Sequence, residues 1–248
     1  MNALPWPERD LTEDVLLGGR VRLRQPRTGY RAATDPVLLA AAVSAPEGAC
    51  VLDVGCGVGA AALCLSARLD VQVHGIEMQA DYAALAAVNA PDMTVWVGDI
   101  FAPPPDITPI GFDWVITNPP FFDVADPASP NQGRDVARRE AQGAQAWTMA
   151  CLRRVRSGGR IAIIHLAERL PEILAGLTGA GDIAVLPLQA RVGRQAKRVV
   201  VTARKGARGP FRLAAPLVLH QGETHEGDFD DFTAAARAVL RDAAPLVF

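Results

Sequence analysis

The chain has 248 residues, of which 50% are hydrophobic, and a formal net charge of −2. This length and composition allow one sizeable hydrophobic core, so we expect a single domain over residues 35–248, preceded by an N-terminal extension over residues 1–34. No apolar run approaches the roughly 20 residues that a membrane-spanning helix needs, and the first ten residues lack the charged-then-apolar order of a signal peptide. We therefore expect a cytoplasmic protein that does not contact a membrane.

Cysteine and histidine spacing argues against a metal site. Four cysteines and four histidines are scattered along the chain, and none of them forms a pair at ligand spacing. The cysteines read as small buried side chains in a reducing compartment. We expect no metal ion and no histidine that acts as a base, and His165, at the end of a predicted strand, is expected to be a packing residue.

The N-terminal extension combines a predicted hairpin with a basic run. Leu16 to Val21 contains two adjacent glycines, which predicts a β-hairpin. Arginine then alternates with apolar residues, so one strand face would be apolar and the other would carry guanidinium groups suited to phosphates. The alternative is an ordinary solvated face, because arginine is far commoner than lysine in this chain. The run has no acid within it and comprises Arg20, Arg22, Arg24, Arg27 and Arg31.

A helix is expected from Asp35 to Ala45, with Asp35 as its cap and Pro36 in its first turn. A short buried strand over residues 50–54 follows. It leads into a turn with glycine at alternate positions, Gly55, Gly57 and Gly59, before a helix predicted near residues 60–69. Such glycines let the backbone pass close to a ligand, and the helix start offers free N–H groups.

This glycine loop predicts a nucleotide-binding site. Asp53, inside the strand, is placed to order the loop or to meet an amino group of the ligand. The loop also fits the looser dinucleotide pattern, with Ala60 in the third glycine place. Glu77 closes the next strand, and a carboxylate at that position accepts both ribose hydroxyls. Loop and acid together therefore indicate an adenosine-containing ligand, either S-adenosylmethionine or a nicotinamide cofactor.

The third strand ends in Gly98-Asp99-Ile100. An acid at this strand end can accept from an adenine amino group, while Ile100 covers a face of the ring. A plain turn is the alternative interpretation. The adenine interpretation favours S-adenosylmethionine.

The Asn118-Pro119-Pro120-Phe121 turn, after a predicted strand over residues 112–117, implies a reaction. Its prolines fix the backbone and remove two N–H donors, so the turn presents carbonyl oxygens, an amide and an aromatic ring in one stiff arrangement. The Asn118 side-chain oxygen and the Pro119 carbonyl can together accept both hydrogens of a planar NH2 group. Phe121, and Phe122 beside it, can stack on a base. Hydride transfer does not call for this arrangement, although a merely stiff loop remains the alternative.

The order of the predicted strands and helices along the chain predicts the fold. Strands near 50–54, 72–77, 94–98, 112–117 and 160–165 alternate with helices near 60–69, 79–90, 136–156 and 167–178. Regular alternation indicates an α/β fold with a parallel sheet and crossover helices on both faces. Residues 183–188 and 199–203 are separated by a loop too short for a helix, which predicts a hairpin with one antiparallel strand. A helix is expected over residues 229–242, and a loop over residues 123–134.

A second acid-free basic run lies in the Arg191–Arg208 region. Clustered cations are the electrostatic footprint of a nucleic-acid partner, so we expect at least one of the two basic runs to contact RNA. The run comprises Arg191, Arg194, Lys197, Arg198, Arg204, Lys205 and Arg208.

These motifs together resemble those of the class I S-adenosylmethionine-dependent methyltransferases, and within them the bacterial valine-tRNA adenine-N6 methyltransferases. The resemblance runs from about Asp14 to near the C-terminus and rests on residues 29–36, 53–59, 77, 98–100 and 118–122. It implies a Rossmann-like fold with a seven-stranded, mostly parallel sheet, S-adenosylmethionine as cofactor, and a tRNA adenine as methyl acceptor. It also implies cofactor contacts at Thr34, Asp35 and Asn118.

Four other functions stay open on the sequence. The same NH2 clamp would serve guanine N2 of ribosomal RNA or a glutamine amide of a protein. A non-catalytic RNA-binding module that retains the cofactor fold belongs to a different class, and so does a nicotinamide oxidoreductase. We favour a monomer.

Overall fold

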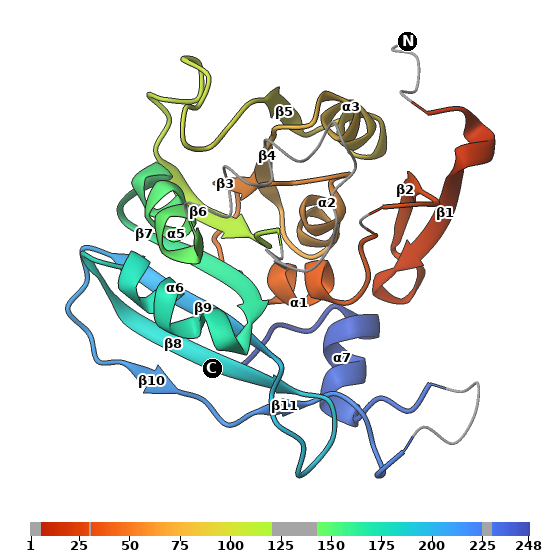
Figure 1. Cartoon of the computed structure of the whole chain (residues 1–248), viewed down its shortest axis with the longest axis vertical. Helices are drawn as coiled ribbons and strands as arrows, with labels where there is room; N and C mark the ends of the chain where they lie inside the picture. The colour runs from red at the N-terminus through yellow and green to blue at the C-terminus, as the bar shows by residue number, and fades with distance from the viewer. Residues whose placement is uncertain (1–5, 30, 121–142, 225–229) are drawn as a thin grey trace.

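The computed structural model describes residues 6–29, 31–120, 143–224 and 230–248. Within these residues the chain forms a nine-stranded sheet and a separate two-stranded hairpin (Figure 1). The order across the large sheet is β10-β8-β9-β7-β6-β3-β4-β5, and β11 also pairs with β8. The α/β class and the predominantly parallel sheet are thereby confirmed.

The N-terminal hairpin consists of β1 (Leu11–Leu16) and β2 (Val21–Pro26), which pair antiparallel. A short 3-10 turn (Glu8–Asp10) precedes it, and a second one (Leu17–Gly19) joins its strands. Gly18 and Gly19 in this joining turn both have positive φ angles, of 63° and 98°. The predicted alternation is present, because Val21 and Leu23 are buried while Arg22 and Arg24 are exposed.

Five parallel strands alternate with helices, as the sequence predicts. The strands are β3 (Ala49–Val54), β4 (Val71–Glu77), β5 (Thr94–Val97), β6 (Phe112–Thr117) and β7 (Val155–Leu166). The helices are α1 (Asp35–Ala41), α2 (Ala60–Ser66), α3 (Ala80–Asn89), α5 (Gly143–Arg154) and α6 (Leu170–Gly176), with a 3-10 turn (Ala167–Arg169) before α6.

The remaining strands close one side of the sheet. β9 (Arg198–Lys205) runs antiparallel between β7 and β8 (Ala180–Gln189), which confirms the predicted antiparallel strand. The strand count differs from the predicted seven, because two strands of two residues each, β10 (Arg212–Leu213) and β11 (Leu217–Val218), add to the outer side of β8. Strands this short carry no readable periodicity.

The sheet has a hydrophobic core on each face. Alternate residues of β7 serve the two cores, since Ala162 and Ile164 belong to one cluster and Ile161 and Ile163 to the other. The first cluster also takes side chains from α1, α2, α3 and α7 (Ala234–Asp242), and the second from α5 and α6. Helices therefore cover both faces, as Figure 1 shows. None of the helices in the described ranges is long and apolar enough to span a membrane.

α1 differs from the prediction at both of its ends. It ends at Ala41 and not at Ala45, and its cap is Thr34, whose carbonyl accepts the first helical hydrogen bond, from the Leu38 N–H at 3.0 Å. Asp35 is therefore the first helical residue and not the cap, and its carboxylate pairs with Arg198 instead. The expected helix near residues 136–156 lies partly outside the described residues. The expected loop over residues 123–134 lies wholly outside them.

Candidate functional site

The predicted functional residues follow four adjacent parallel strands. In the order β6-β3-β4-β5, these strands end at Thr117, Val54, Glu77 and Val97. Val54 is aligned with Thr117 on one side and with Ile76 on the other. The segments that follow these strand ends therefore meet at one edge of the sheet, which is where open α/β sheets bind ligands.

The glycine loop after β3 has a backbone that other residues rarely adopt. Gly55, Gly57 and Gly59 have φ angles of 70°, 55° and 84°. The loop is tied to β4, because the Gly55 N–H donates to the Ile76 carbonyl at 2.8 Å. A Cβ atom on Gly57 would have no atom within 4 Å, so free space adjoins the centre of the loop.

Glu77 holds this loop from the neighbouring strand. The carboxylate is 8% exposed, and its Oε2 accepts the Gly57 N–H at 3.0 Å while Oε1 accepts the Gln79 N–H at 2.9 Å. Each carboxylate oxygen has a further lone pair beyond these bonds. Glu77 thus has a structural role that the sequence did not reveal, and it retains acceptor capacity for a ligand.

Asp53 is a buried carboxyl group beside Glu77. It is 2% exposed, and its Oδ2 makes no hydrogen bond within the described part of the chain. Burial raises its pKa to about 7, the Glu77 charge adds to this rise, and the Ala62 N–H acts in the opposite direction. A buried carboxylate without a partner is unfavourable, so the ionised form calls for a donor or a cation.

Asp99 and Ile100 lie in the turn after β5. The Asp99 Oδ1 accepts the Phe101 N–H at 2.9 Å, which is the turn-forming role that the sequence allowed. Ile100 is 6% exposed and packs in the same core cluster as Val54 and Ile76. The turn is tied to the site, because the Gly98 N–H donates to the Glu77 carbonyl at 2.9 Å.

Asn118 and Pro119 directly follow β6. Asn118 is half-buried with its side-chain oxygen buried, and Pro119 is buried. Their strand end lies next to the glycine loop, because β6 pairs with β3 up to Thr117 and Val54. Phe121 and Phe122, predicted to stack on a base, lie outside the described residues.

Two side chains that the sequence did not single out join these elements. The buried Thr117 hydroxyl donates to the Val54 carbonyl at 2.8 Å and accepts from the Trp147 indole N–H at 3.0 Å. The Trp147 ring also lies against the glycine loop, because a Cβ atom on Gly55 would be 3.4 Å from it. α5, which carries Trp147, thereby braces the loop and the β6 turn together.

Thr34 and Asp35 lie at the start of α1. Thr34 is exposed, and the Asp35 carboxylate forms a 2.8 Å ion pair with the Arg198 Nε. Burial raises the pKa of Asp35, and the Arg198 charge partly offsets this rise. Arg198 is aligned with Leu166, the last residue of β7, so the pair lies at the same edge of the sheet as Asn118.

Four of the five arginines of the N-terminal run contact acids or carbonyls of the protein itself. Strand β1 supplies Glu13, which pairs with Arg22 at 2.7 Å, and Asp14, which pairs with Arg31 at 2.8 Å. Arg20 and Arg27 donate to the backbone carbonyls of Arg241 and Arg9. The run contains no acid in sequence, yet in space the neighbouring strand neutralises part of its charge.

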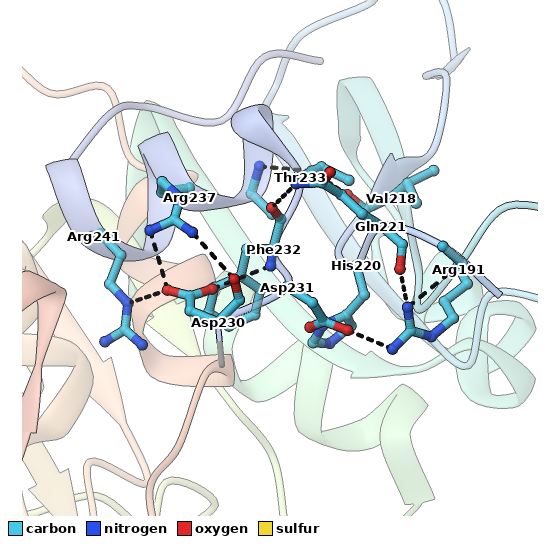
Figure 2. A network of polar contacts seen from close by, with 12 residues as sticks. Arg191, Val218, His220, Gln221, Asp230, Asp231, Phe232, Thr233, Arg237 and Arg241 are labelled. Atoms are coloured by element: carbon cyan, nitrogen blue, oxygen red, sulfur yellow. Dashed lines mark hydrogen bonds and ion pairs between the residues drawn. The ribbon is translucent and has the colours of Figure 1, made fainter. Parts of the chain in front are cut away.

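Arg191 lies in a polar network rather than on a free surface. Figure 2 shows its guanidinium beside Asp231 and beside the Gln221 carbonyl. The distance from the Arg191 Nη2 to the Asp231 Oδ2 is 2.6 Å. The other Asp231 oxygen lies 2.5 Å from the His220 Nδ1. This network joins the loop after β8 to the segment before α7. Arg194 and Lys197 of the same loop are exposed.

The second basic run is divided between the two ends of the sheet. Because β9 is antiparallel to its neighbours, Arg198 lies at the site edge whereas Arg204, Lys205 and Arg208 lie at or beyond the opposite edge. Arg198 and Arg204 are six positions apart along β9, a span of about 20 Å. Only the first half of the run can therefore approach Asn118 directly.

His165 is 1% exposed, and its Nδ1 accepts the Leu166 N–H at 2.7 Å. Burial lowers its pKa to about 4, and the charge of Arg169 acts in the same direction. The residue is buried, as expected for a packing side chain. Within the described ranges, no group of three histidine, cysteine or acidic side chains is arranged to hold a metal ion.

The part of the chain that builds this edge of the sheet matches a known protein family. Residues 33–135, which include the glycine loop, Glu77, Asp99 and Asn118, match the methyltransferase small domain. This match and the named relatives below support an S-adenosylmethionine-dependent methyltransferase.

Curated relatives of this methyltransferase are tRNA-modifying enzymes by name. A "tRNA1(Val) (adenine(37)-N6)-methyltransferase" of Yersinia pseudotuberculosis is 28% identical over 211 residues, covering 79% of this chain and 83% of the relative. The protein of the same name from Haemophilus influenzae is 27% identical over 191 residues, covering 74% of this chain and 81% of the relative.

Two solved structures show the same fold. A predicted O-methyltransferase of Agrobacterium tumefaciens has a TM-score of 0.68 at 23% identity, covering 86% of this chain and 98% of its own. The 16S rRNA N2 G1207 methyltransferase of T. thermophilus has a TM-score of 0.55 at 21% identity, covering 79% of this chain and 50% of its own. At these identities the likeness concerns the fold alone.

Proposed function

We propose that this methyltransferase modifies the N6 amino group of an adenine in tRNA, namely the adenine next to the anticodon of a valine tRNA. The observation that carries this proposal is the position of the Asn118-Pro119 turn immediately beside the glycine loop, with Thr117 bonded to Val54 at 2.8 Å. The names of the curated relatives support the choice of acceptor.

The described residues fit S-adenosylmethionine. Free space adjoins Gly57, and the unpartnered Asp53 oxygen suits the amino group of the methionine moiety. Glu77 retains acceptor capacity for the ribose hydroxyls, and Asp99 has a second carboxylate oxygen for the adenine amino group. Ile100 would border the adenine ring, and Thr34 and Asp35 would border the site from α1.

Asn118 and Pro119 would activate the acceptor by geometry. An exocyclic aromatic amine is a poor nucleophile because its lone pair is delocalised into the ring. When the Asn118 oxygen and the Pro119 carbonyl accept its two hydrogens, the nitrogen is drawn toward tetrahedral geometry and its lone pair becomes available. When bound, S-adenosylmethionine supplies an electrophilic methyl group on a sulfonium centre. The protein residues then mainly position the amine in line with that group.

This chemistry needs no strong base. The amine becomes acidic only after it has gained the methyl group, and its proton can then leave to water. Phe121 is proposed to stack on the flipped adenine, a contact worth roughly 1–3 kcal/mol per base.

The proposal is tested by an unbiased acceptor search. The protein and labelled S-adenosylmethionine are incubated with total RNA and total protein from a strain that lacks the gene, and nucleosides and peptides are analysed by mass spectrometry. We expect N6-methyladenosine in tRNA. N2-methylguanosine or methylglutamine in its place would contradict the acceptor and favour the alternatives that use the same NH2 clamp.

A further inference from the structure

We propose that the protein carries a second RNA-binding surface, which runs from the amino-terminal end of β7 across the end of β9 to the outer side of β8, away from the methyl-transfer site. The choice of RNA as partner rests on the proposed function. This surface, the edge patch, comprises Arg153, Arg154, Arg156, Arg160, Arg204, Lys205, Arg208 and Arg212.

Chain segments that are distant in sequence build the edge patch. α5 ends at Arg154, β7 begins at Val155, and β9 ends at Lys205. The Lys205 Nζ donates to the Val155 carbonyl at 2.6 Å, which fixes the end of β9 against the start of β7. On the outer side, Arg212 of β10 is aligned with Ala184 of β8.

The sheet register places two arginines face to face. Arg160 of β7 and Arg204 of β9 are directly opposed, so their side chains leave the same face of the sheet. Opposed like charges destabilise a sheet. The Arg160 guanidinium lies 6.0 Å from the centre of the Trp114 ring, and the Arg204 Nε donates to the Gly158 carbonyl at 3.0 Å. These contacts orient the side chains without neutralising them, and neither arginine has an ion pair in the described part of the chain.

Acids balance only part of this charge. Asp113 pairs with Arg156 at 2.5 Å, and Asp182 lies beside Gly209. Arg153, Arg208 and Arg212 are exposed and have no ion pair among the described residues. Because the whole chain has a net charge of −2, this local excess of cations does not reflect the overall composition. A polyanion is the complementary partner.

Aromatic and apolar side chains lie within the same surface. Phe211 is 53% exposed and Leu213 is 66% exposed, on either side of Arg212. Guanidinium groups interleaved with an exposed aromatic ring suit a nucleic-acid backbone with accessible bases. The favourable position of cations at a helix C-terminus explains Arg153 and Arg154, but not the arginines of β7, β9 and β10.

The distance between the methyl-transfer site and the edge patch predicts which kind of RNA can contact both. Arg160 is six residues along β7 from Leu166 at the site edge, or about 20 Å. A short stem-loop seated at Asn118 would not reach around the sheet to Arg208 and Arg212. An RNA with a further arm, such as a whole tRNA, would contact both surfaces.

The test is the triple variant Arg153→Gln/Arg208→Gln/Arg212→Gln. Its affinity for whole tRNA is measured across a range of salt concentrations, and its turnover is measured at saturating tRNA. We expect weaker binding, a salt slope reduced by about one for each lost phosphate contact, and unchanged turnover at saturation. Binding of a short stem-loop that carries the target adenine should be unchanged.

The matched control is Arg9→Gln/Arg237→Gln/Arg241→Gln, which removes the same charge elsewhere. A wild-type salt slope in the first variant, or an equal loss in the control, would overturn the edge patch. If the wild-type protein methylates tRNA and the slope does not change, only the edge patch fails. If tRNA is not methylated but the slope still falls, the edge patch stands and the proposed function fails. Thermal unfolding verifies that each variant is folded.

Discussion

The Thr117 hydroxyl bonds to the Val54 carbonyl at 2.8 Å, and this one contact joins the strand end that carries Asn118 to the strand end that carries the glycine loop. Trp147 donates to the same hydroxyl from α5. The relative position of the acceptor turn and the cofactor loop therefore depends on a buried three-residue chain of hydrogen bonds.

Replacing this hydroxyl tests its importance. Thr117→Val keeps the shape but removes the hydroxyl that the Trp147 N–H donates to and that bonds to the Val54 carbonyl, so we expect a loss of about 1–3 kcal/mol in the free energy of unfolding, together with slower methyl transfer. Urea unfolding and single-turnover assays measure the two effects. Thr148→Val is the control, because the Thr148 hydroxyl bonds only within α5, to Ala144. Equal effects in both variants would refute a bracing role for Thr117.

Asn118→Ala removes the proposed amine acceptor. We expect turnover to fall by about 10²–10³-fold or more, while the affinity for S-adenosylmethionine, measured by calorimetry, changes much less. Asn118→Asp keeps an oxygen at the same position and should retain more activity than the alanine variant. Near-normal turnover of Asn118→Ala would remove the proposed mechanism, and it would also revive the non-catalytic alternatives.

The buried carboxyl group of Asp53 predicts that the stability of the protein depends on pH. Its pKa in the folded protein, about 7, lies above the ordinary value of 3.8, so its contribution to stability is present below about pH 4 and is lost as the pH rises through 7. The cofactor-free protein should therefore be less stable at pH 8 than at pH 5.5, and Asp53→Asn should weaken this dependence. Thermal unfolding across this range measures both, and an identical profile in the variant would contradict the buried carboxylate.

The same group predicts proton release on cofactor binding. A cationic amino group next to Asp53 favours the ionised carboxylate, so binding near pH 6 should expel up to one proton and affinity should rise toward pH 8. Calorimetry in two buffers of different ionisation enthalpy measures this proton. If binding releases none, the amino group of the cofactor lies elsewhere.

Glu77→Gln tests whether the carboxylate that holds the glycine loop also binds the cofactor. Glutamine has one side-chain acceptor oxygen in place of two, so the bond to the Gly57 or the Gln79 N–H is lost along with the proposed ribose contact. We expect the affinity for S-adenosylmethionine to fall by about 10–100-fold, as for loss of a hydrogen bond to a charged group. Glu172→Gln is the control, since Glu172 likewise accepts from Arg169 and the Ala144 N–H but lies outside the loop. Unchanged affinity of Glu77→Gln would assign Glu77 to structure alone.

The sequence predicted those parts of the fold that depend on residues close together in the chain. Strand–helix alternation and the glycine spacing require only neighbouring residues, so the sheet, its antiparallel strand and the loop after β3 were readable from the chain. The pairing of Arg31 with Asp14, or of Asp35 with Arg198, depends on strand register and helix placement, which composition does not encode. The division of the second basic run between two surfaces was not predictable for the same reason. It depends on the course of β9, which places Arg198 and Arg204 toward opposite ends of the sheet.

The two-residue strands β10 and β11 have a protective consequence. They occupy the outer hydrogen-bonding side of β8, a strand of ten residues that would otherwise be an unpaired template. Exposed strand edges recruit further chains and promote aggregation. A protein shortened before residue 210 would therefore be prone to self-association during expression, even though every residue assigned to methyl transfer would still be present.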